Sequence, residues 1–575
     1  MLGIRTNYNL DTKSNVKNTQ PSFKGAEMIA TNAFSYLKDN PMVTTALIDT
    51  VLCDVPKAVQ DTKQRNPFAG IETAFREFSG TFNNCFLPGI LGAGFGFLAS
   101  SGINKTFNVK ANKIWADTDT IDAFTDLYKK SNGDQNAFLQ NVLSKVSAGL
   151  DSSHKISGEQ ADNIADAFKG IIAKTGNISK KDHTTLVAQI GEALGGHCEE
   201  IRFNGIDTNV DNFINDTINI SRAFASDKLK VVKDGVKQID NTKLDSFASG
   251  LKNVAKTKTA LAFAVTIPIA VATHYLNRAQ TKKRSGKDGA PIYKDFSDKD
   301  YKRELTPQEK KKLGAQKVLA SGSLAGIALA AIGPKKLSQF GKTMQFRNFR
   351  TSLDQCRVVS TATFASRFMG AADSTELGQS FIRDVSSFMF FYVTGEFVSK
   401  LTAKSMEKPG YDLFRQVMDK PQENDGIMKK LAYVFRGNEL KTHREVLIEE
   451  AIKAGKKLDI TDKGAINTKK LLESLPQEAQ VFAKKRLGVL NKAQAASMAF
   501  SALALGVAIP QLLIKLTDIN EAKRKNKMEE QQSSQQPQKQ EQNNSTVTYK
   551  KFLNNGNFGS SKPQEVFNAF VKNNQ

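Results

Sequence analysis

Four stretches of this chain contain no Asp, Glu, Lys or Arg, and they restrict its fold more than any other feature. They cover residues 78–104, 259–277, 318–334 and 493–514, which are 27, 19, 17 and 22 residues long. A helix needs about 20 mostly apolar residues to cross the roughly 30 Å hydrocarbon core of a bilayer. The sequence therefore predicts an all-α protein, either multi-pass or membrane-associated, with helical soluble regions and disordered ends.

The four runs are not equally strong candidates. The second and fourth predict helices that contain Pro268 and Pro510, and an internal proline is tolerated better in a membrane helix than in a soluble one. The first run is rich in glycine and phenylalanine, and the third consists mostly of small residues. We expect roughly two to five inserted segments, with 259–277 and 493–514 the strongest.

A fifth apolar stretch, 381–401, is interrupted by charge, and its uncharged middle is only 11 residues long. If this stretch crosses a bilayer, Arg383, Asp384 and Glu396 are costly there and mark a functional site. In a soluble core or at an interface they are merely paired, which is the interpretation we favour. His274, inside the second run, is either part of a proton relay or, as we favour, a packing hydrogen bond.

The segment before the first run combines an aromatic stripe with charge. Phe75, Phe78 and Phe82 share one helical face, which predicts a membrane-side stripe. Glu72 and Arg76 are spaced as an i,i+4 pair. We interpret these charged residues as structural support, because the sequence pairs them with no reacting group.

The chain is basic, since 81 Lys and Arg against 58 Asp and Glu give a net charge of +23. Nearly all of the excess lies after residue 277, with +7 over 278–317, +10 over 335–492 and +4 over 515–575. Basic clusters beside apolar runs predict contact with an anionic lipid surface, whereas nucleic acid is not an expected partner. The residues assigned to this surface are Arg278, Lys282, Lys283, Arg284, Lys335, Lys336, Arg347, Arg350, Lys523, Arg524 and Lys525.

Basic clusters directly follow three of the runs, and the positive-inside rule places each cluster in the cytoplasm. Two consecutive simple spans cannot both satisfy this rule, so we expect 318–334 to re-enter the membrane or to pack against protein. Residues 346–368 carry aromatic side chains along one helical face with arginines beside it. This pattern predicts an amphipathic helix at the membrane interface, although an ordinary core-facing helix fits equally well.

Each run also carries small residues four positions apart, a spacing that lets helix backbones approach closely in lipid. We expect these positions to pack helices together within the chain or between copies, although Ala/Gly-rich segments also show the spacing by chance. They are Gly92, Gly96, Ala260, Ala264, Gly322, Gly326, Ala502 and Gly506.

The remaining segments are polar or helical. Residues 1–24 contain no apolar run of a signal peptide, so we expect a disordered start without a cleavable signal. The expected order begins with 1–24 disordered, 25–77 polar and helical, 78–104 a span candidate, 105–258 a soluble helical domain and 259–277 a span candidate. It continues with 278–317 a basic loop and helix start, 318–334 a weak or re-entrant span, 335–401 basic interfacial helices, 402–492 a basic helical region, 493–514 a span candidate and 515–575 a basic, then low-complexity, disordered tail.

Capping signals mark several helix starts in the soluble segments. Ser157 and Ser179 each precede a helical pattern, and Thr306 is followed by Pro307 and Glu309. A Ser or Thr side chain at such a position accepts a hydrogen bond from the main chain three residues later. We therefore expect helices to begin directly after these three residues.

Motifs that would carry chemistry are incomplete. Gly341–Thr343 lacks the earlier glycine of a phosphate-binding loop, and 459–470 has lysines where a calcium loop needs oxygen ligands. The neighbouring side chains of His197–Glu200 diverge, which does not suit zinc. The four cysteines form no CxxC pair and favour a reducing compartment. We expect no enzymatic activity, no cofactor and no metal.

These features favour an integral membrane protein with a structural, scaffold or partner-binding role at a bacterial-type membrane. Its expected partners are the lipid bilayer and a protein partner or second copy held through the small-residue faces. One alternative is a secreted effector that inserts into membranes. Another is a soluble helical assembly protein whose apolar runs are buried core helices.

Overall fold

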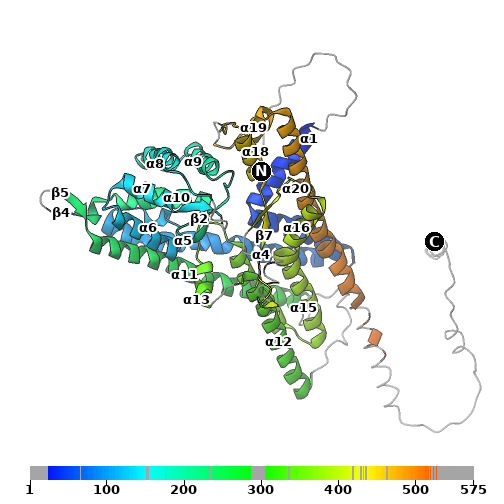
Figure 1. Ribbon diagram of the computed structural model, residues 1–575. Helices are drawn as coiled ribbons and strands as arrows, with labels where there is room; N and C mark the ends of the chain where they lie inside the picture. The colour runs from blue at the N-terminus through cyan, green and yellow to red at the C-terminus, as the bar shows by residue number, and fades with distance from the viewer. Residues whose placement is uncertain are drawn as a thin grey trace, which may run out of the picture. The chain divides into compact units, whose positions relative to one another are not determined.

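The computed structural model describes residues 24–526, apart from 65–66, 150–153, 175, 234–235, 286–304, 334–336, 417–419, 428–429, 431–432, 434–436, 462–463, 517–518, 520–521 and 524–525. The described chain is mostly helical, as expected, with three small antiparallel sheets (Figure 1). The predictions for residues 1–23, for most of the C-terminal tail and for Lys335, Lys336, Arg524 and Lys525 lie outside the described residues.

The first described part is a series of helices with very short connections. They are α1 (Lys24–Asp39), α2 (Pro41–Leu47), the π-helix η1 (Ile48–Asp54), α3 (Val55–Gln64), α4 (Pro67–Cys85) and α5 (Leu87–Phe107). The last two are bent by 42°. Pro88 lies in the first turn of α5, where its missing N–H costs nothing, and it cannot extend α4. The predicted run 78–104 is therefore a bent pair of helices.

Residues 105–258 fold around one buried core. Their elements are the 3₁₀ helix η2 (Ala111–Lys113), α6 (Thr118–Lys130), α7 (Gln135–Ser144), β1 (Val146–Ala148), α8 (Gly158–Ile172), α9 (Lys180–Ala193), β2 (Glu200–Phe203), β3 (Ile206–Asn209), α10 (Val210–Phe224), the 3₁₀ helix η3 (Asp227–Leu229), β4 (Lys230–Lys233) and β5 (Val236–Ile239). Antiparallel pairing joins β1 to β2, β2 to β3 and β4 to β5. The sequence did not indicate these strands, because three or four residues are too few to show a clear alternation.

Helix α11 (Asn241–Ser285) connects this buried core to the apolar helices. Its first turns place Leu244, Phe247 and Leu251 in the buried core of the 105–258 region. The helix continues through Pro268 for 45 residues, a length of about 65–70 Å at 1.5 Å per residue. It packs along α5 (Figure 1). The predicted boundary between soluble domain and span therefore falls inside one continuous helix.

The second half of the described chain is again helical. Its elements are α12 (Pro307–Ile332), α13 (Leu337–Thr343), α14 (Leu353–Gly370), α15 (Ser374–Met389), the π-helix η5 (Phe390–Thr394), α16 (Gly395–Met406), β6 (Phe414–Gln416), β7 (Asn438–Leu440), α18 (His443–Lys453), α19 (Thr468–Ser474), α20 (Gln477–Leu503) and the π-helix η6 (Ala504–Ala508). Strands β6 and β7 pair antiparallel. The wider turn of η6 directly precedes Pro510, whose missing N–H such a turn accommodates.

Three helices are long and apolar enough to cross a membrane, namely Asn241–Lys283, Pro307–Ile332 and Gln477–Leu516. The bent pair α4–α5 is a fourth if its halves are taken as one span. Within the described residues, 381–401 does not meet the same test. It is divided among α15, η5 and α16, as its internal charges favoured.

The predicted helix starts are confirmed. Ser157 and Thr306 form full capping boxes, and the side chain of Ser179 accepts a hydrogen bond from the third residue of α9. Because α12 begins at Pro307, it carries a charged first half and an apolar second half. Such local signals need no tertiary partner, which is why the sequence alone predicts them.

The helix expected over 346–368, for which an interfacial and a core-facing position were both open, begins later than expected. The helix in this region, α14, starts only at Leu353, and Phe346, Phe364 and Phe368 are all buried. The physical reason is that the arginines find protein partners: Arg357 donates to a carboxylate one turn earlier and to a carbonyl oxygen of η5. The core-facing alternative holds for α14.

Candidate functional site

Helices α4 and α11 carry buried polar side chains beside exposed apolar ones. On α4, Phe75 and Phe78 are 44% and 60% exposed, whereas Glu72 is 8% exposed. On α11, Leu276 is 52% exposed, whereas its neighbour Asn277 is 5% exposed. A helix at the surface of a soluble protein has the opposite distribution.

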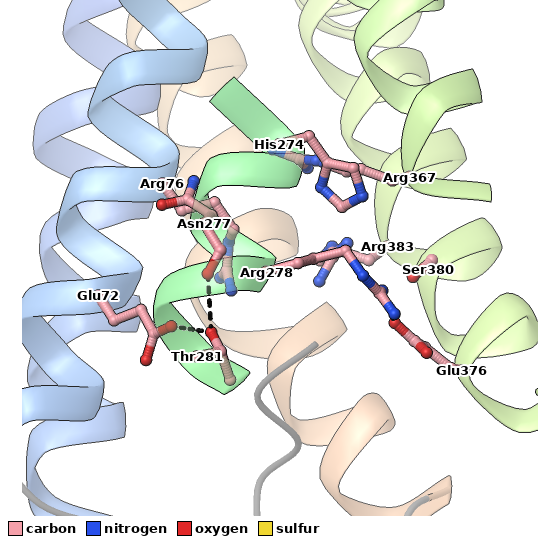
Figure 2. Close-up of a pocket in the computed structure, with 10 residues that line it drawn as sticks. All are labelled: Glu72, Arg76, His274, Asn277, Arg278, Thr281, Arg367, Glu376, Ser380 and Arg383. Atoms are coloured by element: carbon pink, nitrogen blue, oxygen red, sulfur yellow. Dashed lines mark hydrogen bonds and ion pairs between the residues drawn. The ribbon is translucent and has the colours of Figure 1, made fainter. Parts of the chain in front are cut away.

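The inward-facing polar side chains of α4, α11, α14 and α15 meet around one small pocket (Figure 2). Four arginines, two glutamates, one histidine and three uncharged polar residues line it. They are Glu72, Arg76, His274, Asn277, Arg278, Thr281, Arg367, Glu376, Ser380 and Arg383. The cavity volume is about 20 Å³, which is space for one or two water-sized particles.

Ion pairs across this pocket join three helices. Arg278 Nη1 of α11 lies 2.5 Å from Glu376 Oε1 of α15. Asp384 Oδ1 of α15 accepts hydrogen bonds from Arg367 Nη1 of α14 at 3.0 Å and from Arg383 Nε at 2.8 Å. Burial opposes ionisation of Asp384, but the two guanidinium groups outweigh it and hold the pKa of this carboxyl below its usual value. The cluster therefore holds fixed charges in a buried position.

Helix α4 is the fourth helix of the polar cluster. The hydroxyl of Thr281 donates a hydrogen bond to Glu72, which links α11 to α4 (Figure 2). Next to it, Arg76 Nη2 lies 3.0 Å from Glu77 Oε1 on the same helix. The contact between Thr281 and Glu72 thus joins two helices through residues that are 209 positions apart in the sequence.

Three buried polar atoms at the pocket have no hydrogen-bond partner. They are His274 Nε2, Asn277 Oδ1 and Arg367 Nε, and their residues are 8%, 5% and 6% exposed. Figure 2 shows His274 on α11 and Arg367 on α14 among the side chains that line the pocket. Leaving a buried polar group unpaired costs about 1–3 kcal/mol, so three of them beside one cavity call for an occupant of that cavity.

Two carboxyls lie on η1, the half-buried Asp49 and the buried Asp54, within electrostatic reach of the same cluster. Asp54 is 3% exposed, and its nearest cationic atom is Lys57 Nζ at 3.7 Å. Burial and the neighbouring Asp49 raise the pKa of Asp54 to about 9. Burial also raises the pKa of Asp49 to about 6. Asp54 therefore carries a proton at neutral pH.

A second charged network lies where the 105–258 and 402–492 regions pack together. Arg415 of β6 contacts Glu445 of α18 at 2.9 Å and Glu200 of β2 at 3.3 Å. Arg444 of α18 contacts Glu199 at 2.7 Å. Glu199 and Glu200, which do not suit a metal site, thus serve as ion-pair partners. In the described part of the chain, no group of three or more His, Cys, Asp or Glu is placed to hold a metal ion.

The structure gathers three of the four ionisable residues singled out in the apolar stretches. His274 and Arg383 line the pocket, and Asp384 lies directly behind it. Glu396 lies elsewhere, with its half-exposed carboxylate 2.7 Å from Lys400 one turn later. The arrangement at Asp384 and Glu396 is the paired one that we favoured.

Three of the predicted lipid-facing basic residues instead contact protein. Arg278 pairs with Glu376, Arg347 Nη2 lies 2.6 Å from a carboxylate oxygen of Asp117, and Arg350 donates to a side-chain oxygen. The assignment of Arg278 and Arg347 to a lipid surface is corrected, because carboxylates are within their reach, whereas Arg350 remains exposed. Lys282, Lys283 and Lys523 are exposed, and Arg284 lies at the end of α11.

The predicted small-residue contacts divide into two groups. Gly92 and Gly96 are buried, and a Cβ atom at these positions would meet Phe346 and Lys258. Gly506 approaches η1, and Ala502 is half-buried beside it. Ala260, Ala264, Gly322 and Gly326 are exposed, and the prediction that they pack against helices of this chain is corrected. On α11 the packed face passes through Ala262, Thr266 and Ala270.

The sequence did not predict Arg367 and Glu376 as site residues, and it treated Glu72 and Arg76 as support. A signal was present on α4, where buried polar positions oppose the predicted phenylalanine stripe. Arg367 and Glu376 carry no comparable signal, because only the packing of α14 and α15 against α11 brings them to the pocket.

Comparison with known proteins adds no further assignment. No family model, no curated protein and no solved structure is similar to this chain. The class that the fold itself defines is a mostly helical protein with three or four helices able to span a membrane.

Proposed function

We propose that this chain is an integral membrane protein with three or four spans, and that its role there is structural, as a scaffold or partner-binding protein. One observation carries the proposal. The most apolar windows of the three candidate helices are only 28%, 22% and 33% buried inside the chain, at mean hydropathies of 1.6, 1.4 and 1.8. In a soluble protein, windows of this kind form the core.

The polar cluster supports the same proposal. In a bilayer, charged groups face the interior of a helix bundle and pair with one another, as Arg278 does with Glu376 and Asp384 with two arginines. Water is available to solvate such groups at a soluble surface, so there is little gain in burying them behind exposed phenylalanines. In a bilayer, both the buried position of the charged groups and the exposed position of the phenylalanines are favourable.

The size of the pocket favours a structural role over transport. A cavity of about 20 Å³ is far below the several hundred Å³ of a usual small-molecule site. The polar contacts also connect α4, α11, α14 and α15 directly to one another. We therefore assign the cluster to holding these helices in place.

A matched pair of lysine substitutions tests the proposal. Leu503 lies at the middle of the 493–514 run and is 64% exposed, and Val232 of β4 is 63% exposed. A lysine at the centre of a span costs about 2.5–3.5 kcal/mol of insertion free energy. We expect Leu503→Lys to weaken insertion of the 493–514 span alone, so that protease added from one side of the membrane cleaves the residues after 514 differently from the wild type, whereas Val232→Lys leaves this cleavage pattern unchanged.

The wild-type protein provides the reference. We expect it to stay in the membrane pellet through washes with high salt and with carbonate. Release by salt alone would reduce the proposal to electrostatic docking of the basic flanks. Recovery of the wild type in the soluble fraction, with Leu503→Lys equally soluble and folded, would overturn it in favour of a soluble helical assembly.

A further inference from the structure

Three residues that each have an unpartnered buried atom line the pocket. Arg367 Nε–H is a donor, His274 Nε2 is a donor in one neutral tautomer, and Asn277 Oδ1 is an acceptor that rotation of the amide exchanges for the N–H₂ group. With the amide rotated, all three groups are donors at one pocket. A ligand that only accepts hydrogen bonds satisfies all of them together.

The charge around the pocket also favours an acceptor. Its lining holds the guanidinium groups of four arginines and the carboxylates of two glutamates. Asp384 and Glu77 contact three of these arginines from outside the lining, so the cationic groups face the cavity and part of the compensating charge lies behind them. Arginine clusters of this type bind anions through charge-assisted hydrogen bonds.

The size of the cavity limits the anion. A volume of about 20 Å³ admits one monatomic ion or one to two waters, and excludes phosphate esters and metabolites. A metal cation is disfavoured, because the described residues include no group of three or more His, Cys, Asp or Glu placed to bind one. A water molecule fits by size, but it uses two of its positions as donors and leaves part of this donor set unsatisfied.

We propose that the pocket among α4, α11, α14 and α15 binds one halide ion, chloride under cellular conditions, held by Arg367, His274 and Asn277. The ion joins the side of the cluster on α11 to the side on α14. Binding therefore stabilises the contact between these helices. The site depends on this local geometry and not on membrane insertion, so it goes beyond the proposed function and is tested separately from it.

The first experiment measures binding to the full-length protein purified in detergent and transferred to sodium gluconate. We expect equilibrium dialysis with radiolabelled chloride to show about one ion per chain, since the cavity admits one. The midpoint of thermal unfolding should rise with added chloride or bromide and reach saturation, at ionic strength held constant with gluconate. A pocket filled by water only gives no saturable binding, and that result overturns the proposal.

Two substitutions locate the ion. Asn277→Leu keeps the size of the side chain and removes its hydrogen-bonding group, so bound chloride should fall about tenfold or more. Asn491→Leu removes a half-buried amide that contacts His443 and Thr31, which are not among the pocket-lining residues, and should leave chloride binding intact. Equal binding by both variants would place any ion elsewhere and refute the site.

A third substitution provides a test if Asn277→Leu fails to fold. His274→Phe keeps a ring at the pocket and removes the Nε2 atom. Chloride affinity that is lower than in the wild type supports the site, whereas unchanged affinity in this variant opposes it. Failure of the membrane experiment leaves these outcomes unaffected, because they are measured on solubilised protein.

Discussion

Substitution of Asp384 by asparagine is the most direct test of the buried charge cluster. Asp384 is 1% exposed, and its carboxylate contacts Arg367 and Arg383 at 3.0 and 2.8 Å. Asparagine keeps the shape but removes the charge, and it leaves Arg367, itself 6% exposed, without its buried counter-ion. Breaking a buried pair on one side costs about 3–5 kcal/mol.

We expect the loss of stability in Asp384→Asn to lie near the lower end of this range, because Glu77 also lies within electrostatic reach of Arg367 and Arg383. A loss of about 3 kcal/mol lowers the ratio of folded to unfolded protein by roughly 150-fold. Denaturation of the detergent-solubilised protein, followed by far-ultraviolet circular dichroism, measures this loss through its helical signal. The pH dependence gives a second readout.

The sign of that dependence follows from the lowered pKa of Asp384. The group stabilises the fold above its unfolded pKa of about 4, and this contribution is lost as the pH falls through the lower folded value. The wild type should therefore lose stability below about pH 4 more steeply than Asp384→Asn, which lacks this group.

The control is Asp245→Asn, which breaks an exposed pair whose lysine and aspartate side chains are 31% and 58% exposed. An exposed pair contributes about 0–1 kcal/mol. A loss at Asp384 no greater than at Asp245 would refute the reasoning. So would an Arg367→Met, Asp384→Asn double variant no more stable than Asp384→Asn alone, because removing the unpaired cation should recover stability.

Other contacts give further predictions. Because the raised pKa of Asp54 favours its neutral form, this group lowers stability as the pH rises from about 4 towards 9, and Asp54→Asn should raise the melting temperature at pH 8 more than at pH 5; an equal shift would contradict this. Cys85 of α4 and Cys356 of α14 are buried and within hydrogen-bonding reach of each other. Diamide, a thiol oxidant that takes up the two electrons and two protons, should therefore couple them into an intrachain disulfide detectable by mass spectrometry, and the Cys356→Ser variant should form none. Gly506→Ala should cost about 1–3 kcal/mol, because its Cβ would lie 2.7 Å from a main-chain oxygen of η1. Gly322→Ala, with no neighbour within 4 Å, should be neutral or stabilise α12 by up to about 1 kcal/mol, and a reversed order of the two denaturation midpoints would contradict the packing.

The sequence predicts those parts of the fold that depend on local interactions. The helix starts at Ser157, Ser179 and Thr306 are set within four residues by a side chain and the adjacent main chain. The apolar runs likewise predict long helices by composition alone. The strands β1 to β7 escape prediction, because each is three or four residues long and depends on a distant partner.

The candidate site depends on long-range packing and is less predictable. His274, Arg383 and Asp384 are visible in the sequence, because ionisable groups in apolar stretches are costly. Their partners are not visible: Arg367 belongs to a helix that appears amphipathic, and Glu376 lies 98 residues from Arg278. Only the packing of α11, α14 and α15 decides that these side chains meet.

The distance in sequence between charged partners has a consequence for biosynthesis. A ribosome adds about 5–20 residues per second, so the 98 residues from Arg278 to Glu376 take on the order of 5–20 s. During that interval the new α11 carries an arginine whose counter-ion does not yet exist. Under the proposed membrane insertion, Arg278 directly follows the 259–277 run, so water at the membrane surface solvates it until α15 emerges. The ion pair that joins α11 to α15 therefore forms only after part of the C-terminal half of the chain has been made.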